Sequence, residues 1–434
     1  VRFCRMNCEN VSKISQTAAV CALTGAGVYL ASRVLKVMKD SSQNSNSRIP
    51  NPSVVNKIPS VRDNVQSLSE DRDGVIFPYE HERRMKERLA QQAVDESDHI
   101  ERNKVVVKVP ATSANLGPGY DTIGMALDLW SEFTVERSDK FEIVCEGEGS
   151  YDMPLDETNL VCLGISAAFK AANKPVPPLK YKLVNRIPYA RGLGSSSAAI
   201  IGGLLAGLVL AGHRLSAWGS EEILNYACEI EGHPDNVAPA LYGGIQVGIH
   251  TGARWTTERV NLPPGLQCIC FSPEFIGKTS VARAALPDMI SRKEAVYNIG
   301  RVAWLINALS SNNLENLRWG VEDALHQPHR AAKVYPYLNS VMEAALEAGA
   351  CAVFLSGAGP TVMALTSGAS GDIFTQRAQE RVDKRVAEAM IAAAEKKEVK
   401  GNVQITAPVI HGAYVVHAEP AFSSARVHYS HGDI

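Results

Sequence analysis

The sequence predicts a two-domain α+β protein that follows an N-terminal extension. The chain has 434 residues, of which 45% are hydrophobic, and this is enough for two packed domains and a further segment. Expected strands and helices succeed one another from about residue 105 to residue 417. A break rich in Pro and Gly at residues 263–265 divides them. We therefore expect an extension at 1–103, domains at 104–264 and 265–419, and a tail at 420–434.

Composition argues against two classes of protein. The formal net charge is −2 and the charges are interspersed, so the chain has no basic surface suited to nucleic acid. Its nine cysteines include no Cys-x-x-Cys pair and no Cys/His cluster, so neither a disulfide framework nor a zinc site is indicated, and we expect reduced thiols. Cys268 and Cys270 share one face of an expected strand, where small buried hydrophobic side chains are the simplest interpretation.

The first hundred residues indicate an extension without chemistry. Residues 1–43 are poor in acids, and an apolar segment at 17–35 is interrupted by two glycines and Arg33. We expect no stable membrane span and no stable membrane partner; a plastid or other organellar address is one interpretation, a flexible or helical extension of a cytoplasmic protein the other. Residues 41–56 read as a linker and residues 80–102 as a solvated helix rich in both charges.

In the first domain, hydrophobic patterning predicts strands and helices in alternation. A strand at 105–109 is expected to end at Pro110, and a helix at 224–231 is expected to break near Pro234. The apolar run at 198–211 predicts a buried helix, because its hydrophobic residues lie on all sides. The remaining expected elements are strands at 127–135, 141–145, 181–187 and 244–249 and a helix at 159–172.

In the second domain, the pattern predicts fewer elements with clear limits. We expect strands at 266–271, 352–355 and 413–417, and helices that begin near Ile290 and Leu338. No internal repeat is visible. Together these elements predict an α+β alternation for the second domain, which includes the strand at 413–417.

A glycine- and serine-rich segment, Arg191-Gly-Leu-Gly-Ser-Ser-Ser-Ala198, precedes the long apolar helix. Free backbone N–H groups at the start of a helix attract anions, so this segment is a candidate phosphate-binding loop. It has no Lys before a final Ser or Thr, which excludes a Walker-A loop, and its consecutive serines fit a Rossmann fingerprint poorly. Taken alone, a serine cap on a buried helix explains the segment equally well.

Three further segments accompany this loop. They are Pro110 to Asp121, the motif Glu231-Gly-His-Pro-Asp-Asn236, and Leu355 to Thr361. In this order the four segments resemble those of the GHMP kinase superfamily, and specifically its homoserine kinase branch. The resemblance extends from about residue 105 to about residue 417. The long extension and the tail after Glu419 depart from the family pattern.

The resemblance implies a fold and a reaction. The fold would be a ribosomal-S5-like N-terminal kinase domain followed by a ferredoxin-like C-terminal domain, commonly in a homodimer. The reaction would be transfer of the γ-phosphoryl group of ATP to the side-chain hydroxyl of L-homoserine with Mg²⁺, in threonine biosynthesis. Two alternatives stay open, namely another kinase of the superfamily, of the mevalonate or shikimate class, and a non-catalytic ligand sensor.

The resemblance also assigns nucleotide- and metal-binding residues. Ser196 and Glu231 would hold Mg²⁺ through oxygen atoms, with Glu229 as a second choice, although charged residues near a helix end are more often only solvated. Asn159 and Val161 match the adenine-contacting segment, although an Asn before a helix is ordinarily a cap. The ATP phosphates would lie against the loop residues Arg191, Gly192, Leu193, Gly194, Ser195, Ser196 and Ser197.

The acceptor site must pair both charges of an amino acid. Asp121, with Asn115 beside it, would receive the ammonium group. Arg283, in a segment that includes Thr279, and Arg330 would bind the carboxylate with planar guanidinium groups; without the resemblance, each would more simply be an exposed helix charge.

Two residues of the Glu-Gly-His-Pro-Asp-Asn motif complete the predicted site. We expect His233 to hydrogen-bond the substrate. Asp235 is either a candidate base or, with Asn236, part of an Asx turn. We also expect the loop at 355–361 to close over the phosphates, or to be a plain hairpin turn.

Overall fold

The computed structural model describes residues 100–212, 220–367 and 373–421. The expected apolar segment at 17–35 and the linker at 41–56 lie outside these ranges, as does the charged helix at 80–102 except for its last residues. These assignments stay predictions. None of the helices in the described ranges is long and apolar enough to cross a membrane.

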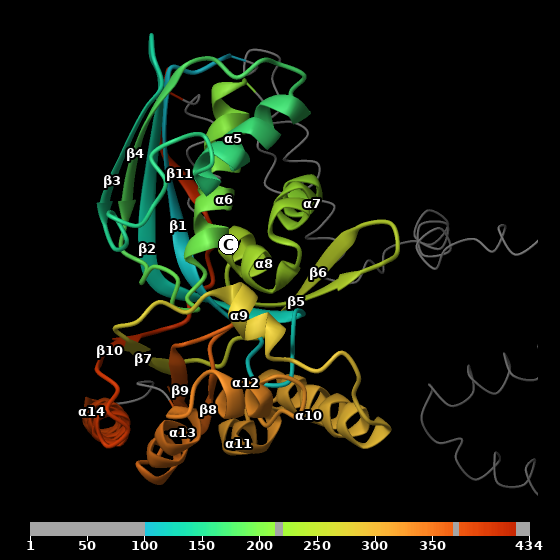
Figure 1. The fold of residues 1–434 in the computed structure, drawn as a ribbon, viewed down its shortest axis with the longest axis vertical. Helices are drawn as coiled ribbons and strands as arrows, with labels where there is room; N and C mark the ends of the chain where they lie inside the picture. The colour runs from blue at the N-terminus through green and yellow to red at the C-terminus, as the bar shows by residue number, and fades with distance from the viewer. Residues whose placement is uncertain (1–99, 213–219, 368–372, 422–434) are drawn as a thin grey trace, which may run out of the picture. The chain divides into compact units, whose positions relative to one another are not determined.

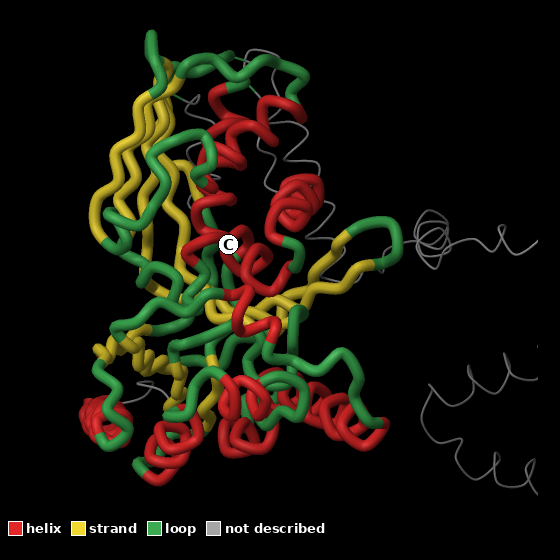
Figure 2. The backbone as a smooth tube through the Cα atoms, in the orientation of Figure 1, coloured by secondary structure: helices red, strands yellow, loops and turns green. Residues whose placement is uncertain are grey.

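A seven-stranded sheet forms the first layer (Figures 1 and 2). Its order is β11-β1-β2-β4-β3, with β5 paired to β2 and β6 paired to β5. The pairs are antiparallel except for β3 and β4, which are parallel. The bounds are β1 Lys104–Ala114, β2 Ile123–Arg137, β3 Glu142–Gly147, β4 Leu179–Asn185, β5 Ile245–His250, β6 Trp255–Val260 and β11 Tyr414–Glu419.

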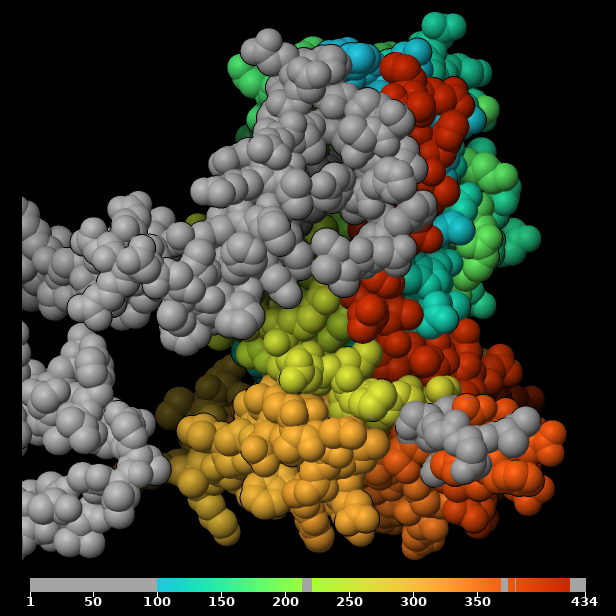
Figure 3. All heavy atoms as spheres, turned by 180° about the vertical axis from the view of Figure 1, so that it is seen from behind, coloured from blue at the N-terminus to red at the C-terminus, as the bar shows by residue number. Residues whose placement is uncertain are grey.

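The last strand corrects one expectation. We predicted that residues 413–417 belong to the second domain, but β11 pairs antiparallel with β1, from Lys104 opposite Glu419 to Lys108 opposite Tyr414. Figure 3 shows the red C-terminal strand beside the blue first strand from behind. The chain therefore returns to the first sheet after completing the second.

The first strand also differs from its prediction. It continues through Pro110 to Ala114 instead of ending at Pro110. Two features accommodate the proline, which has no N–H to donate. β11 pairs with β1 only up to Lys108, and the pairing of β1 with β2 shifts register between Pro110 and Ala111. The loop of the candidate site consequently begins at Asn115.

Helices cover one face of this sheet (Figure 1). They are α5 (Leu160–Ala171), α6 (Ser195–Leu210), α7 (Ser220–Glu231) and α8 (Pro234–Tyr242). Most residues of α6 are buried, as its apolar sequence predicts. The expected break near Pro234 is only a turn at Gly232 and His233, because Pro234 occupies the first turn of a further helix, where its missing N–H costs nothing.

The second layer is an antiparallel sheet of order β10-β7-β9-β8 with helices on it. The order and the intervening helices are those of a ferredoxin-like fold, with extra helices inserted after the first strand. Its strands are β7 Gln267–Pro273, β8 Ala352–Leu355, β9 Val362–Thr366 and β10 Gly401–Thr406; its helices are α9 Thr279–Ala284, α10 Arg292–Ser310, η3 Leu314–Asn316, α11 Leu317–Gly320, α12 Gln327–Lys333, α13 Leu338–Glu347 and α14 Ile373–Glu395. The prediction of an α+β fold is confirmed.

The cysteines of β7 lie where the sequence predicts. Cys268 and Cys270 are both buried and free, and Cys270 contacts the sulfur of Met363 on β9. Burial raises the pKa of the Cys270 thiol to about 12, so the thiol stays protonated near neutral pH. Small hydrophobic packing accounts for both residues.

Candidate functional site

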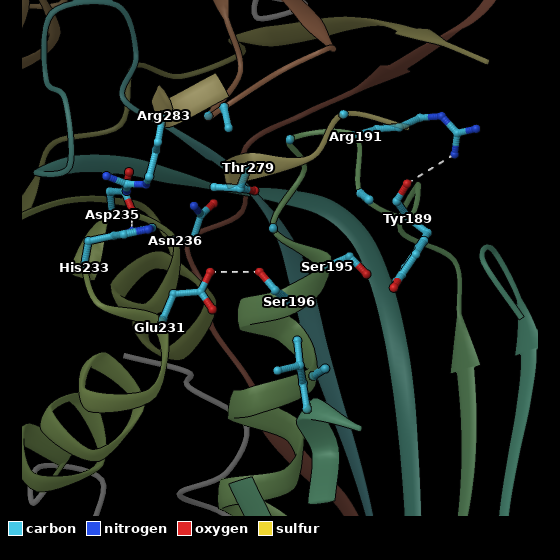
Figure 4. Close-up of a pocket in the computed structure, with 18 of the residues that line it drawn as sticks. Tyr189, Arg191, Ser195, Ser196, Glu231, His233, Asp235, Asn236, Thr279 and Arg283 are labelled. Atoms are coloured by element: carbon cyan, nitrogen blue, oxygen red, sulfur yellow. Dashed lines mark hydrogen bonds and ion pairs between the residues drawn. The ribbon is translucent and has the colours of Figure 1, made fainter. Parts of the chain in front are cut away.

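A cavity of about 290 Å³ lies where the two layers meet. It brings together segments that are far apart in the sequence: the loop after β1, the start of α6, the turn between α7 and α8, and the start of α9. Of the residues singled out in the sequence, these line it: Asn115, Asp121, Asn159, Arg191, Gly192, Gly194, Ser195, Ser196, Glu231, His233, Asp235, Thr279, Arg283 and Arg330. The close-up in Figure 4 shows most of them.

The start of α6 presents free donors to this cavity. Gly194 is the N-cap residue, with a left-handed φ of 71°, and no side chain caps the helix. The first N–H groups of a helix have no intrahelical acceptor, so those of Ser195 and Ser196 remain available to an anion. The predicted phosphate-binding loop therefore has the geometry that its chemistry requires.

The two glycines of this loop are required by close packing. A Cβ on Gly194 would lie 1.9 Å from Oγ1 of Thr112, and one on Gly192 would lie 2.3 Å from the carbonyl oxygen of Ser356. Both residues also have positive φ, which side chains disfavour. Thr112 on β1 and the turn after β8 thus hold the loop from two sides.

Ser196 and Glu231 lie side by side at the wall of the cavity (Figure 4). The hydroxyl of Ser196 on α6 donates to Oε1 of Glu231 at the end of α7, at 2.8 Å. Both are oxygen donors of the kind that Mg²⁺ prefers, and neither is fully buried. Glu229, the second choice from sequence, does not line the cavity.

Four of the predicted nucleotide-binding residues do not present an available side chain to the cavity. Val161, Leu193 and Ser197 are fully or almost fully buried and do not line the cavity, so only their backbone could meet a nucleotide. The guanidinium of Arg191 donates to the carbonyl oxygens of Pro273 and Glu274, both at 2.7 Å, and points away from Ser196 in Figure 4. Arg191 therefore fastens the loop to the end of β7.

Asn159 acts as the helix cap that its ordinary role predicts. Its side-chain oxygen accepts from the backbone N–H of Val161 at 3.1 Å, and its amide donates to the carbonyl oxygen of Pro154 at 2.8 Å. It still lines the cavity beside Met153 and Thr158. The cap fixes the start of α5 at this wall, so a base-binding role for the segment stays a prediction.

Asp121 and Arg283 form a bidentate ion pair. The two terminal nitrogens of Arg283 lie 2.9 and 2.7 Å from the two carboxylate oxygens of Asp121. Both side chains are about one-third exposed, so the pair is open to an incoming ligand. In this arrangement the predicted ammonium-binding and carboxylate-binding groups satisfy each other. A ligand that has both charges could separate them at little electrostatic cost.

Arg330 is deeply buried, which contradicts the reading of it as an exposed helix charge. Its side chain donates to the carbonyl oxygens of Ala282 at 3.2 Å and Gly357 at 2.9 Å and to Nδ1 of His326 at 3.0 Å. No described residue accepts a hydrogen bond from its Nη2, and the residue lines the cavity. Arg330 is therefore held rigidly with one donor group uncommitted.

His326 positions this arginine and was not singled out from the sequence. An arginine cannot accept, so Nδ1 of His326 accepts from Arg330 and Nε2 donates to the carbonyl oxygen of Gly117 at 2.6 Å. Burial lowers the pKa of His326 to about 4; the carboxylate of Asp323 opposes this effect and the charge of Arg330 reinforces it. The imidazole is consequently neutral and joins Arg330 to the loop after β1.

Tyr120 lies between the two arginines. The guanidinium carbons of Arg283 and Arg330 are each 5.6 Å from the centre of its ring, and its hydroxyl accepts from Arg283 at 2.9 Å. Burial raises the pKa of Tyr120, so the phenol is neutral. An aromatic face stabilises nearby cations, which allows two like charges to stand in one site.

Asp121, His233 and Asp235 form a group next to Arg283 and Arg330 that we call the anionic corner. The ligand atoms of Asp121, His233 and Asp235 are all within 4.8 Å of one another. Nδ1 of His233 contacts the Asp235 carboxylate, which is buried. Burial lowers the pKa of His233, but the hydrogen bond to Asp235 and the charges of Asp235 and Asp121 outweigh it and raise the pKa overall. Asp235 thus orients the imidazole and does not stand alone as a base.

The loop after β1 is held in one conformation by the second layer. Asn115, with a φ of 70°, accepts from the backbone N–H of Asp121 at 3.0 Å and donates to the carbonyl oxygen of Gly357 at 2.9 Å. Asn298 on α10 donates to the carbonyl oxygen of Pro118 at 2.8 Å. Asn115 therefore fixes the conformation of this loop. Its side-chain amide has fewer hydrogen-bonding groups free for a ligand than we predicted from the sequence.

The Gly-rich loop at 355–361 is the turn of the hairpin formed by β8 and β9. The hairpin alternative is thus correct, yet Gly357 and Ala358 also line the cavity. Ser356 donates to the carbonyl oxygen of Gly192 at 2.6 Å, and its hydroxyl meets that of Ser113 at 2.8 Å. One turn therefore contacts both glycine-rich segments of the first layer.

Protonation of His326 should destabilise the protein in acid. With a folded pKa of about 4, against about 6.5 unfolded, the folded state binds fewer protons, so the free energy of unfolding falls as the pH falls between these values. The expected loss from about pH 7 to about pH 5 is on the order of 2 kcal/mol. The pKa of His233 is raised in the folded state, so this residue has the opposite effect on the free energy of unfolding. Its stabilising contribution is complete below the pKa of the unfolded state and is lost as the pH rises above that value.

Urea unfolding across this pH range measures the effect. A His326→Gln variant should lose most of the pH dependence while being less stable at neutral pH. An unchanged slope in that variant would assign the acid sensitivity to another group.

Known proteins resemble this chain in both sequence and structure. The model of the GHMP kinases N terminal domain matches residues 159–244, and the model GHMP kinases C terminal matches residues 295–392. Homoserine kinase of Moorella thermoacetica is 41% identical over 311 residues, covering 72% of this chain and 99% of that protein. Homoserine kinase of Carboxydothermus hydrogenoformans is 45% identical over 263 residues, covering 60% and 84%.

Solved structures of GHMP kinases also resemble the structure of this chain. The crystal structure of homoserine kinase from Cytophaga hutchinsonii matches with a TM-score of 0.63 and 26% identity, covering 73% of this chain and 98% of that one. Mevalonate diphosphate decarboxylase from Staphylococcus aureus matches with a TM-score of 0.53 and 13% identity, covering 73% and 98%. The second likeness shows the fold alone, so the fold by itself does not select the acceptor.

Proposed function

Because this chain belongs to the homoserine kinase family of the GHMP kinases, we propose that it transfers the γ-phosphoryl group of ATP to the side-chain hydroxyl of L-homoserine, giving O-phospho-L-homoserine and ADP. This reaction is a step in threonine biosynthesis. The observation that best supports the substrate is the pairing of Asp121 with Arg283 in the same cavity as the free start of α6.

The acceptor part of the cavity suits a zwitterion. The corner formed by Asp121, His233 and Asp235 favours an ammonium group, and the guanidinium groups of Arg283 and Arg330 favour a carboxylate. Mevalonate and shikimate have a carboxylate but no ammonium group, so they would leave Asp121 without a partner once Arg283 turned to the ligand. This charge balance favours an amino acid over those acceptors.

The nucleotide part of the cavity suits ATP with Mg²⁺. The phosphates would meet the backbone N–H groups of Ser195 and Ser196, because a helix start attracts anions without the help of a lysine. Ser196 and Glu231 would hold Mg²⁺, and the oxygen donors at 2.8 Å from one another fit this ion. When bound, the ion neutralises charge on the phosphate oxygens. Thr279 and Asn159 would line the two ends of the site.

The chain's own residues would contribute mainly by positioning. Phosphoryl transfer through a loose transition state needs alignment and charge neutralisation more than a strong base. His233 would use Nε2 to orient the acceptor hydroxyl, because Nδ1 is engaged by Asp235. The turn containing Gly357 and Ala358 would exclude water at the junction of the two substrates.

Measurement of ADP release tests this proposal. The purified chain with Mg-ATP should turn over with L-homoserine and not with mevalonate, shikimate or galactose. Turnover with another acceptor alone would keep the kinase and overturn the acceptor assignment. Ligand binding without any turnover would favour a non-catalytic sensor, which the presence of both Ser196 and Glu231 argues against.

Replacement of Tyr120 should weaken homoserine binding. Tyr120→Leu removes the aromatic face between the two arginines, and we expect the KM for homoserine to rise about 10- to 100-fold, since each cation–π contact contributes about 0.5–2 kcal/mol. Tyr120→Phe removes only the hydroxyl that accepts from Arg283, so a few-fold rise is expected. Steady-state kinetics with both substrates varied measure this.

The KM for ATP shows whether a Tyr120 variant has lost only homoserine binding or has lost the structure of the site in general. It should stay near the wild-type value in both Tyr120 variants. Tyr297→Leu is the matched control, because Tyr297 packs under Arg301 at 4.5 Å but outside the cavity. Equal effects on both substrates would contradict the assignment.

A further inference from the structure

Ser356 is a buried residue of the turn between β8 and β9. Its side chain is fully buried and does not line the cavity. The backbone N–H of Ser356 closes the turn, because it donates to the carbonyl oxygen of Thr361 at 2.9 Å. Gly357, the next residue, has a left-handed φ of 56° and does line the cavity. Ser356 can therefore affect a ligand only through the residues that it holds.

On one side the turn is bonded to the phosphate-binding loop. The hydroxyl of Ser356 donates to the carbonyl oxygen of Gly192 at 2.6 Å, and the N–H of Thr361 donates to the carbonyl oxygen of Arg191 at 3.3 Å. A Cβ on Gly192 would lie 2.3 Å from the carbonyl oxygen of Ser356, so the two backbones are in close contact. A displacement of the loop must therefore displace the turn as well.

On its other side the turn supports the acceptor part of the cavity. The carbonyl oxygen of Gly357 accepts from the side chains of both Asn115 and Arg330, each at 2.9 Å. The N–H of Gly357 donates to the carbonyl oxygen of Ala114, the last residue of β1, at 3.0 Å. The positions of Asn115 and Arg330 thus depend on one residue of the turn.

The hydroxyl hydrogen bonds at the turn have a single possible direction. The hydroxyl of Ser113 lies 2.8 Å from that of Ser356, and both side chains are fully buried. A carbonyl oxygen cannot donate, so the proton of Ser356 points to Gly192, and Ser113 must donate to Ser356. This chain of hydrogen bonds joins β1, the turn and the phosphate-binding loop.

The turn connects parts of the molecule that belong to different layers. In Figure 1, β8 and β9 belong to the lower layer, whereas β1 and α6 belong to the upper one. We propose that Ser356 is a positioning residue that couples the two substrate sites, so that a bound nucleotide and a bound amino acid each strengthen the binding of the other. This inference rests on the proposed function, because it requires both ligands to occupy the one cavity.

The sign of the coupling follows from the shared turn. Phosphates at the start of α6 hold the phosphate-binding loop in place, and through Ser356 they also restrain the turn. A carboxylate on Arg330 then binds a site whose turn is already ordered, so less conformational entropy is lost. By linkage, the amino acid strengthens nucleotide binding by the same factor, and such factors are typically about 5- to 150-fold.

Isothermal titration calorimetry of the full chain tests the proposal, with L-homoserine and a non-hydrolysable ATP analogue with Mg²⁺. The coupling ratio is the Kd of homoserine without the analogue divided by its Kd with saturating analogue. In the wild-type chain it should be about 5 or more. In Ser356→Ala it should fall by about 3-fold or more, as for the loss of one hydrogen bond. The Kd of each ligand alone should change less than the ratio.

Ser272→Ala is the matched control. The hydroxyl of Ser272 on β7 forms a pair of the same length, 2.8 Å, with that of Thr361 in the same turn. That pair lies within the second layer, and neither residue lines the cavity. Ser272→Ala should therefore keep the wild-type coupling ratio. An equal loss in Ser272→Ala and Ser356→Ala would assign the effect to a general loosening of the turn and contradict the proposal.

Ser113→Ala gives a second readout. It removes the donor to Ser356 but keeps the hydrogen bond from Ser356 to Gly192, so the coupling ratio should fall less than in Ser356→Ala. The double variant should behave like Ser356→Ala alone, since the two hydroxyls act in one chain. Additive effects of the two substitutions would show that Ser113 acts by another route and would overturn the chain of hydrogen bonds as the link.

The same titrations separate this proposal from the proposed function. A wild-type chain that binds no homoserine, with or without the analogue, would overturn the proposed function and the coupling together. Binding of both ligands with a wild-type coupling ratio of about one would overturn the coupling alone, and so would an unchanged ratio in Ser356→Ala.

Discussion

Glu231→Gln is expected to reduce kcat by about 100- to 1,000-fold while leaving the KM for homoserine within a few-fold of wild type. Gln keeps the size of the side chain and one acceptor oxygen for Ser196, but it removes the negative charge that would help to hold Mg²⁺. An interaction that acts mainly in the transition state appears in kcat, at a cost of a few kcal/mol. Ser196→Ala should act in the same direction.

The same helix offers a control for this prediction. Glu229 lies two residues before Glu231, is exposed and does not line the cavity. Glu229→Gln should therefore leave kcat and the KM for homoserine nearly unchanged. A raised Mg²⁺ requirement in Glu231→Gln, absent in Glu229→Gln, would identify the metal as the cause. Equal activities of the two variants would show that Glu231 is not a metal ligand.

Arg283→Ala is expected to lower kcat/KM for homoserine about 100-fold or more, with the KM for ATP unchanged. Removal of one partner of a charge pair in a partly desolvated site costs about 2–5 kcal/mol, because the other partner is left unmatched. The loss should fall mainly on KM, since the carboxylate of the substrate takes no part in the transferred bond. Arg283→Lys should be almost as impaired, because a lysine cannot reproduce the planar fork.

Aminopropanol, which is homoserine without its carboxylate, tests the reason for this loss. The wild-type enzyme should prefer homoserine strongly, and Arg283→Ala should narrow the ratio of kcat/KM between the two acceptors. Arg318→Ala removes an exposed guanidinium that packs on Trp319, outside the cavity, and should leave the ratio unchanged. If Arg283→Ala kept the full preference, the carboxylate would be bound by other groups.

The helices and strands were predictable wherever one pattern dominated. The strand at 352–355 was predicted with its observed bounds, and the long apolar run after the serines is helix α6. The effect of a proline was harder to predict, because it depends on which backbone groups have partners. The predicted break near Pro234 is confirmed, since α7 ends at Glu231 and Pro234 begins α8. The predicted end of the first strand at Pro110 is wrong, and the strand continues there because β11 pairs with β1 only up to Lys108.

The residues of the candidate site were largely predictable, but their arrangement was not. Motif resemblance named the residues that line one cavity, from Asn115 to Arg330. It did not indicate that Arg283 pairs with Asp121, or that Arg191 turns to the end of β7. Tyr120 lies within the segment Pro110 to Asp121 and His326 stands four residues before Arg330, yet their roles depend on contacts across more than 150 positions of sequence.

The sequence by itself determined the local chemistry of this protein: the free helix start after Gly194, the apolar α6, the acidic and basic groups of the site, and the family to which they belong. These properties depend on residues that are close together in the chain, so pattern and motif reveal them. Only the tertiary structure decided that β11 joins the first sheet, that Arg330 is buried on a neutral His326, and that one turn contacts both glycine-rich segments of the first layer. Those features arise from packing between distant segments, where burial and the available partners set the state of each group.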